Sequence, residues 1–157
     1  MDSDSEIIRY KQQLASLIIG NERIVELINA EDIEEPEDLI HHNVFEFIRV
    51  PEVPEEQKTY ICFKVNIPEV YTSNFMFKKV MITIYVITHQ GLMITDEGGT
   101  RIDLIGREIT RMLNGYKGIG KAPLERISDV EESLGDKHRC RIICFLASDL
   151  NGGCRKS

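Results

Sequence analysis

Lys79-Val-Met-Ile-Thr-Ile-Tyr-Val-Ile-Thr-His89 is a run dominated by β-branched and aromatic residues, and neither Gly nor Pro interrupts it. This composition is typical of a β-strand. One face of the strand would be entirely apolar, with Val80, Ile82, Ile84 and Val86. The opposite face would also be more than half apolar, with Met81, Tyr85 and Ile87. We therefore expect a strand inside a sheet that is covered on both faces.

A helix is predicted directly after this strand and the polar turn 90–99. Thr100 has the position of an N-cap, and its spacing to Asp103 is that of a capping box in which the carboxylate reaches back. Asp103 and Arg107 stand at i and i+4, the spacing of a helical ion pair. Asn114-Gly115 is a helix end. The apolar residues that recur at helical spacing are Ile102, Ile105, Ile109, Met112 and Leu113.

The N-terminal region is predicted to hold two helices. The first would cover 4–19, beginning at Ser3 or Ser5 and stopping at Gly20, and Asn21 would cap the second. Residues 31–38 then contain six carboxylates in eight positions, which favours a solvated loop that ends in a short helical turn at 37–40. A calcium loop is disfavoured because the stretch lacks the Gly that such loops use for their bend.

Four further extended segments are predicted around the central strand. They are 44–50, 60–67, 124–130 and 139–147, with a hairpin loop at 52–59, a bridge at 68–74 and an acidic turn at 131–137. Strands that follow one another in this way suggest an antiparallel meander. The predicted fold class is therefore α+β, a mainly antiparallel sheet with helices packed on it.

Length and composition indicate one ordinary globular domain. We place it at 1–151, with the N-terminal helices over 1–30, the sheet and the helix 101–114 over 44–147, and a C-terminal tail at 152–157. No apolar run approaches the roughly 20 residues of a membrane span. The acidic N-terminus is unlike a secretory signal, so we expect a cytoplasm-like compartment and free thiols at Cys62, Cys140, Cys144 and Cys154. A net charge of −7 argues against a protein that grips duplex DNA.

No residue pattern predicts catalysis, a cofactor or a metal. His138, Cys140 and Cys144 share a strand face, with Cys62 or His89 as a further ligand, but residues i and i+4 of a strand are about 13 Å apart, too far for one ion. His89 with a carboxylate of the 96–97 turn is a weak dyad, because a single His at a strand end is usually an edge or surface residue. The Gly120-Lys121 step lacks the Ser or Thr that a phosphate-binding loop requires.

The order of elements resembles one known family. In this chain the residues that carry the resemblance are the strand ending Ile-Tyr-Val-Ile-Thr-His89, the helix Thr100-Arg-Ile-Asp-Leu-Ile-Gly-Arg-Glu-Ile-Thr-Arg-Met-Leu-Asn114, a Gly-rich loop, and the ending Ala147-Ser-Asp-Leu-Asn151. Over roughly 44–151 the chain resembles the tail terminator, or tail-to-head joining, proteins of long-tailed bacteriophages. The most specific parts are Arg101-Ile-Asp-Leu-Ile105 and Ser148-Asp-Leu-Asn151.

The resemblance implies a ring-forming structural protein of the virion, located in its tail or neck and made in the host cytoplasm. It implies a homohexamer that binds the tail tube protein and the head connector or head-closure protein, while DNA passes through the lumen without specific binding. The expected ring and partner contacts are on three loops, with Glu55, Glu56, Lys58, Gln90, Asp96, Glu97, Arg101, Lys117 and Lys121. Two rivals are another neck protein, such as a head-closure or adaptor protein, and a small cytosolic enzyme or regulator that uses His89, His138 and the thiols.

Overall fold

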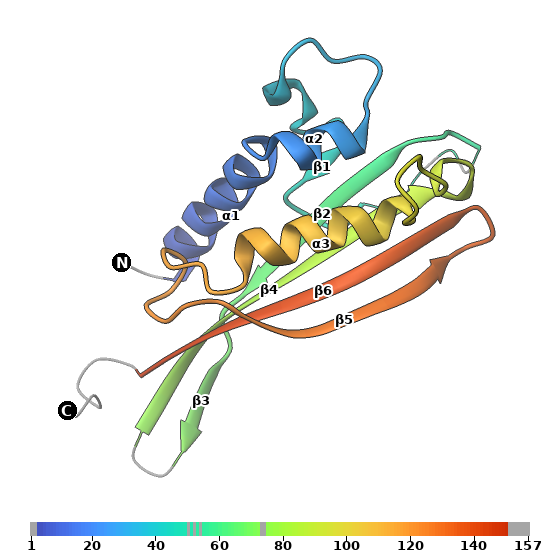
Figure 1. The fold of residues 1–157 in the computed structure, drawn as a ribbon. Coiled ribbons are helices and arrows are strands. Elements are labelled where there is room, and N and C mark those ends of the chain that lie inside the picture. Colours follow the sequence, from blue (N-terminus) through green and yellow to red (C-terminus); the bar gives the residue numbers. More distant parts are fainter. Residues whose placement is uncertain (1–2, 50, 52, 54, 73–74, 151–157) are drawn as a thin grey trace.

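The computed structural model describes residues 3–49, 51, 53, 55–72 and 75–150. Its elements, drawn in Figure 1, are helices α1 (Ser3–Ile19), α2 (Glu22–Ile28) and α3 (Arg101–Leu113), the 3₁₀ helices η1 (Pro36–Leu39) and η2 (Gln90–Leu92), and strands β1 (Val44–Phe45), β2 (Thr59–Asn66), β3 (Glu69–Thr72), β4 (Phe75–His89), β5 (Glu125–Leu134) and β6 (His138–Leu150). Six strands form one sheet in the order β1-β2-β4-β6-β5, and β3 also pairs with β4. The α+β class is confirmed.

The helix boundaries follow from caps that the sequence displays. The Asn21 side chain accepts hydrogen bonds from the backbone N–H groups of Arg23 and Ile24 at the start of α2. Thr100 accepts from the N–H of Asp103 at the start of α3, and Gly115 follows the helix with φ +87°. The Asp103 carboxylate accepts hydrogen bonds from Arg141 of β6. The predicted bond from Asp103 back to the start of the helix is therefore wrong, and so is the predicted ion pair between Asp103 and Arg107.

The N-terminal strand pairing differs from the predicted meander. β1 is only two residues long, and it runs parallel to β2, not antiparallel. After β1 the chain turns across the sheet, where the Cys62 thiol donates to the carbonyl of Arg49 at 3.8 Å. Among its described residues the predicted strand 44–50 is therefore wrong beyond Phe45, and, because β1 and β2 run parallel, the connection between them is a crossover and not the predicted hairpin loop.

β2, β3 and β4 form one long hairpin. The β2 pairing ends at Asn66 with Met81, and the β3 pairing resumes at Glu69 with Lys78 without any offset in register. Pro68 separates the two strands because it has no N–H to donate, although its carbonyl still accepts from Lys79. The described part of the predicted bridge 68–74, residues 68–72, is thus an arm of the hairpin, and Figure 1 shows this arm projecting beyond the helices.

β5 and β6 form a second hairpin at the other edge of the sheet. β5 extends to Leu134, so most of the predicted acidic turn 131–137 is strand, paired as far as Leu134 with His138. A register shift between Arg126 and Ser128 interrupts the ladder. β5 is exposed along most of its length, which explains why its charged residues looked like a turn.

The main hydrophobic core lies on one face of the sheet. The three α-helices contribute to one cluster with the inward residues of β2, β4 and β6, among them Phe63, Ile84 and Phe145. The opposite face has a small second cluster at one end, formed by Phe45, Tyr60, Cys62, Ile87 and Cys140. The prediction that β4 is central is confirmed, but the prediction that both of its faces are covered is wrong.

Arg141 joins α3 to the outer strands beneath the helix. Its guanidinium lies 2.7 Å from Asp103 of α3, 2.6 Å from Asp129 and 3.1 Å from Glu131 of β5. The stem of Arg141 passes so close to α3 that a Cβ added at Gly106 would be 2.8 Å from its Cδ. Gly106 therefore makes room for the arginine stem.

Alanine at Gly106 is expected to destabilise the protein by about 1–2 kcal/mol, because three carboxylates prevent the Arg141 stem from moving aside. In an ordinary helix interior the same change stabilises by about 1 kcal/mol. Urea unfolding of Gly106→Ala in the native and Arg141→Ala backgrounds measures both values. Destabilisation in the native background and stabilisation in the second are expected, and equal effects in the two would contradict the steric explanation.

Candidate assembly surfaces

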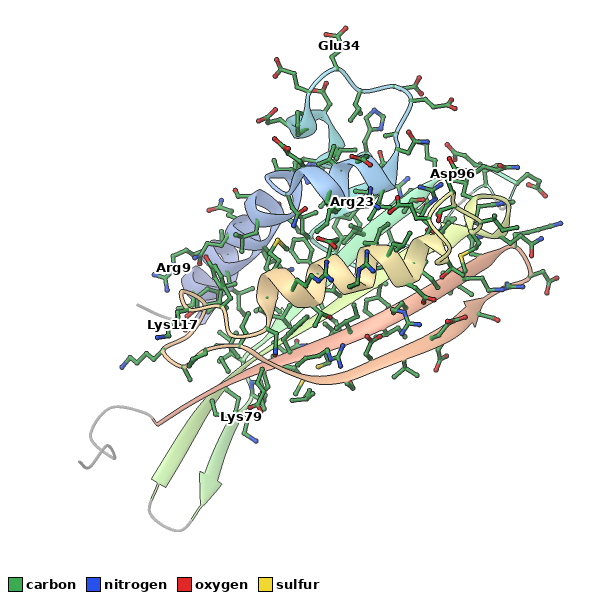
Figure 2. All side chains as sticks on the ribbon, viewed as in Figure 1. Arg9, Arg23, Glu34, Lys79, Asp96 and Lys117 are labelled. Carbon is green, nitrogen blue, oxygen red and sulfur yellow. The ribbon has the colours of Figure 1, made fainter. Side chains whose placement is uncertain are left out.

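The loops predicted to make contacts lie at two opposite ends of the sheet. Segment 56–58 and the turn after β4 lie side by side, since the N–H of His89 donates to the carbonyl of Lys58 and a Cβ at Gly91 would touch Gln57. Loop 116–121 lies at the other end, where the Gln13 side chain of α1 donates to the carbonyl of Gly118. Figure 2 shows the two ends through Asp96 and Lys117.

Loop 93–99 is held in place by several bonds. Glu97 pairs with Arg23 of α2, and this bond lowers the pKa of the Glu97 carboxyl. The Thr95 hydroxyl donates to the carbonyl of Gly99 at 2.7 Å. This fixed loop presents Ile94 to solvent with 90% of its surface exposed. Sequence reasoning passed over Ile94, since a single apolar residue in a polar turn carries no periodic signal.

The Arg101 side chain links the start of α3 to α2 and to the turn after β4. Its Nε donates to the carbonyl of Leu92 at 2.7 Å and its Nη1 to the carbonyl of Leu27 at 2.5 Å. The side chain is half-buried and lines a cavity of about 250 Å³ together with Glu56 and Lys58. The cavity wall carries both signs of charge, since Glu31, Asp32 and His42 also line it.

The remaining predicted contact residues are on the surface. Glu55, Gln90 and Asp96 are exposed at the end of the sheet that holds the cavity, where the amide oxygen of Gln90 accepts from Arg139 at 3.4 Å. Lys117 and Lys121 are exposed at the opposite end, on a loop anchored by the buried Ile119. The structure thus groups the first two loops and separates the third from them.

The sheet face away from the helices has no covering element over most of its length among the described residues. Half-buried side chains of β4 and β6 line its middle, and Val130 of β5 is 48% exposed beside them. The segment after β1 covers only the end with the second cluster. The apolar residues on the open part are Met81, Tyr85, Ile142, Cys144, Leu146 and Val130, and the polar residues Lys64, Thr83 and Ser128 lie in the same pairing rows. An antiparallel sheet facing water normally alternates with polar residues on that side.

His89 and His138 lie side by side where β4 and β6 pair, and both are buried, which for His89 differs from the expected edge or surface position. Their ring centroids are 5.3 Å apart with an edge-to-face arrangement. His89 Nδ1 accepts from the N–H of Gly91, and His138 Nε2 has no hydrogen-bond partner among the described residues. Burial, and secondarily His89, lowers the pKa of His138.

The thiols of Cys62 and Cys140 are buried on the sheet face away from the helices, whereas Cys144 is half-buried there. Burial raises the pKa of Cys140 to about 12, with smaller contributions from Cys62 and Glu132. Burial likewise raises the pKa of Cys62. Both groups are protonated thiols at neutral pH, and a thiolate is what metal binding or nucleophilic attack needs. Within the part of the chain that the structure describes, no three metal-ligating side chains gather.

The buried His138 predicts that stability falls in mild acid. Above the ordinary histidine pKa both states are neutral at this site, but below about 6.5 the unfolded chain binds the proton more readily than the folded one. The free energy of unfolding should therefore decrease by up to about 1.4 kcal/mol per pH unit as pH falls from 6.5. Urea unfolding of the native protein and of His138→Gln at pH 7.5, 6.5 and 5.5 measures this, and the two should respond to pH differently. Parallel responses would contradict the prediction.

Comparison with known proteins gives two findings. The sequence model of a protein family described as YomW matches residues 21–145. Among solved structures, a chain of "Virion of native gene transfer agent (GTA) particle" is similar, with a TM-score of 0.49 and 15% sequence identity, over 85% of this chain and 98% of that chain. No curated protein matches the chain. No helix in the described ranges is long and apolar enough to cross a membrane.

Proposed function

The chain belongs to the YomW family, and we propose that it is a structural protein of a phage-type virion, a tail terminator that closes into a ring on the tail tube. The ring is a homohexamer that joins the tail to the head connector or head-closure protein. The protein acts by assembly and performs no catalytic step.

The open sheet face is the observation that carries this proposal. Exposed apolar patches of this kind mark interaction sites in soluble proteins. Tyr85 and Ile142 lie at its centre, and Met81, Leu146 and Val130 lie around them. A protein that works inside an assembly can keep such a face, because its partner covers it.

The strand edges support the same role. β5 is the last strand of the sheet on one side and is exposed over most of its length. β3 pairs with β4 along one edge, and no described strand pairs with its other edge. Such edges offer unpaired N–H and C=O groups to a neighbour. A head-to-tail interface repeated by rotation closes a ring without any catalytic residue.

Light scattering of the purified protein, followed by electron microscopy of its mixture with tail tubes, tests the proposal. We expect either a particle of six times 18.0 kDa or a monomer that forms rings only on tube ends. A strict monomer that ignores tube ends would overturn the tail-terminator role. Binding to portal complexes in place of tubes would assign the protein to a head-closure or adaptor position in the neck.

A pair of variants tests whether the open face is used. Val130→Glu places a charge on this face at a position that is already half exposed, so the fold should persist. Ile127→Glu is the matched control, since Ile127 is 50% exposed on the same strand, at the register shift. Val130→Glu is expected to weaken assembly at least tenfold and Ile127→Glu much less. Equal effects would contradict the assignment of the open face.

A further inference from the structure

One end of the molecule is strongly acidic. The six carboxylates of 31–38 are all exposed, and Glu31 and Asp32 line the same cavity as Glu56. Asp96 lines a second hollow that shares Asn29 and Arg101 with this cavity. Figure 2 shows Glu34 and Asp96 at this end. We call residues 31–38 with Glu55, Glu56 and Asp96 the acidic end.

The cations near the acidic end are mostly engaged within the chain. Arg23 pairs with Glu97 and Glu26, and Lys58 lies 3.1 Å from Glu56. Arg101 points inward to two backbone carbonyls. Lys137 is exposed here, at the β5–β6 turn, but the carboxylates outnumber it. The acidic end therefore presents excess negative charge to solvent.

The opposite end carries a group of cations. Lys117 and Lys121 are exposed on the loop after α3, and Gly120 between them packs against Val80, which follows Lys79. Arg9 is exposed on α1, one turn before the Gln13 that bonds to this loop. Figure 2 shows Arg9, Lys79 and Lys117 at this end. Among the described side chains the basic end consists of Arg9, Lys11, Lys79, Lys117 and Lys121, with the carboxylates of Glu6 and Glu125 beside them.

We propose that the acidic end docks on the basic end of the next copy of this chain, and that this contact closes the ring. The inference rests on the proposed function, which supplies the ring. β4 runs from the basic end at Val80 to the acidic end at His89, a span of about 30 Å at strand spacing. Charges of opposite sign that far apart on one rigid sheet lie beyond the screening length of about 8 Å, so they attract neighbouring copies rather than each other.

The geometry favours a head-to-tail contact between copies over a symmetric two-fold dimer. A two-fold dimer would place each surface against itself, so the acidic end would meet an acidic end. A head-to-tail contact instead satisfies both ends of each copy with one interface. Complementary charge across such an interface also fixes which surfaces meet and rejects other orientations.

Charge reversal tests this contact directly. Lys117→Glu with Lys121→Glu reverses the basic end, and Glu34→Lys with Glu37→Lys reverses the acidic end at side chains that are exposed. Each variant alone is expected to need at least tenfold more protein to form rings, in solution or on tube ends. Mixing the two variants restores ring formation, because each reversed end then meets a reversed end on its neighbour.

Matched controls carry the same change of net charge at other places. Arg107→Glu with Arg111→Glu, both exposed on α3, controls for the loss of positive charge, and Glu22→Lys with Glu132→Lys controls for the gain. Thermal unfolding of every variant checks that the fold is intact. Ring formation of the native protein should also weaken between 0.15 and 1 M NaCl, since exposed charges are screened.

The outcomes separate this inference from the proposed function. If the native protein forms rings and both reversal variants form them equally well, the charge contact is wrong and the proposed ring still stands. A native protein that forms no ring, alone or on tube ends, would overturn the proposed function itself. Equal loss in the reversal and control variants would show that net charge, not the two ends, governs assembly.

Discussion

Replacing Phe145 by alanine is expected to lower the free energy of unfolding by about 3–5 kcal/mol, the largest single effect in this chain. Phe145 is fully buried on β6, on the sheet face covered by the helices. Removing its ring leaves a cavity that the packed helices and strands cannot fill completely. Urea unfolding, with the midpoint and slope compared between variants, measures the change.

Leu146→Ala is the matched control for this prediction. Leu146 is the next residue of the same strand, but its side chain lies on the open face and is half-buried. Its truncation is expected to cost less than about 1.5 kcal/mol, because little packing is lost there. A cost for Leu146→Ala equal to that of Phe145→Ala in the isolated protein would contradict the one-sided core.

Arg141→Met is expected to destabilise the protein by about 2–3 kcal/mol, because hydrogen bonds to a charged group are lost. Asp103, Asp129 and Glu131 would then face one another without the cation that they share. Their mutual repulsion should loosen β5 from α3, although solvent screens Asp103 and Glu131, which are about half exposed. Chemical unfolding in 0.1 M salt measures the loss.

A second variant separates repulsion among the carboxylates from the loss of hydrogen bonds to the guanidinium. Adding Asp129→Asn to Arg141→Met removes one carboxylate of the cluster and should recover part of the stability. Asp129 is chosen because its contact with Arg141 is the shortest, at 2.6 Å. If the double variant is no more stable than Arg141→Met, the hydrogen bonds lost with the guanidinium, and not repulsion among the carboxylates, account for the effect.

The sequence predicted those elements whose signals are local. The unbroken run 79–89 indicated β4, and the Thr100 cap with its apolar spacing indicated α3, whose apolar positions Ile102, Ile105, Ile109 and Leu113 are all buried. The cap at Asn21 located α2 in the same way. In each case the residues that form the signal also make the bonds or contacts that define the element.

The pairing of strands that are distant in the sequence could not be predicted from such local signals. The residues after Phe45 have a strand-like composition, but only Val44 and Phe45 find a partner, and they pair parallel to β2. Nothing in 131–134 indicated a strand either, because its carboxylates are exposed at the sheet edge and one of them bonds to Arg141 of the next strand. An edge strand needs no apolar alternation, so its pattern resembles that of a turn.

The assembly surfaces likewise combine features that the sequence indicates with features that only the structure shows. The sequence indicated which loops are polar, but not that 56–58 and 90–92 lie together while 116–121 lies at the far end. It also suggested that β4 is apolar on both sides, and the structure shows that one of those sides has no covering element in the described chain. An apolar strand face has the same composition whether its own chain or another protein covers it.

The projecting arm of the long hairpin has a consequence for amide hydrogen exchange. β3 makes its main contacts with β4, while the middle of β4 is held by β2 on one side and β6 on the other. Segments with few tertiary contacts open separately from the rest of a domain. Amides of Val70 and Tyr71 should therefore exchange much faster than those of Ile82 and Ile84 in the free protein. Slower exchange in the arm after assembly would locate a neighbour on it.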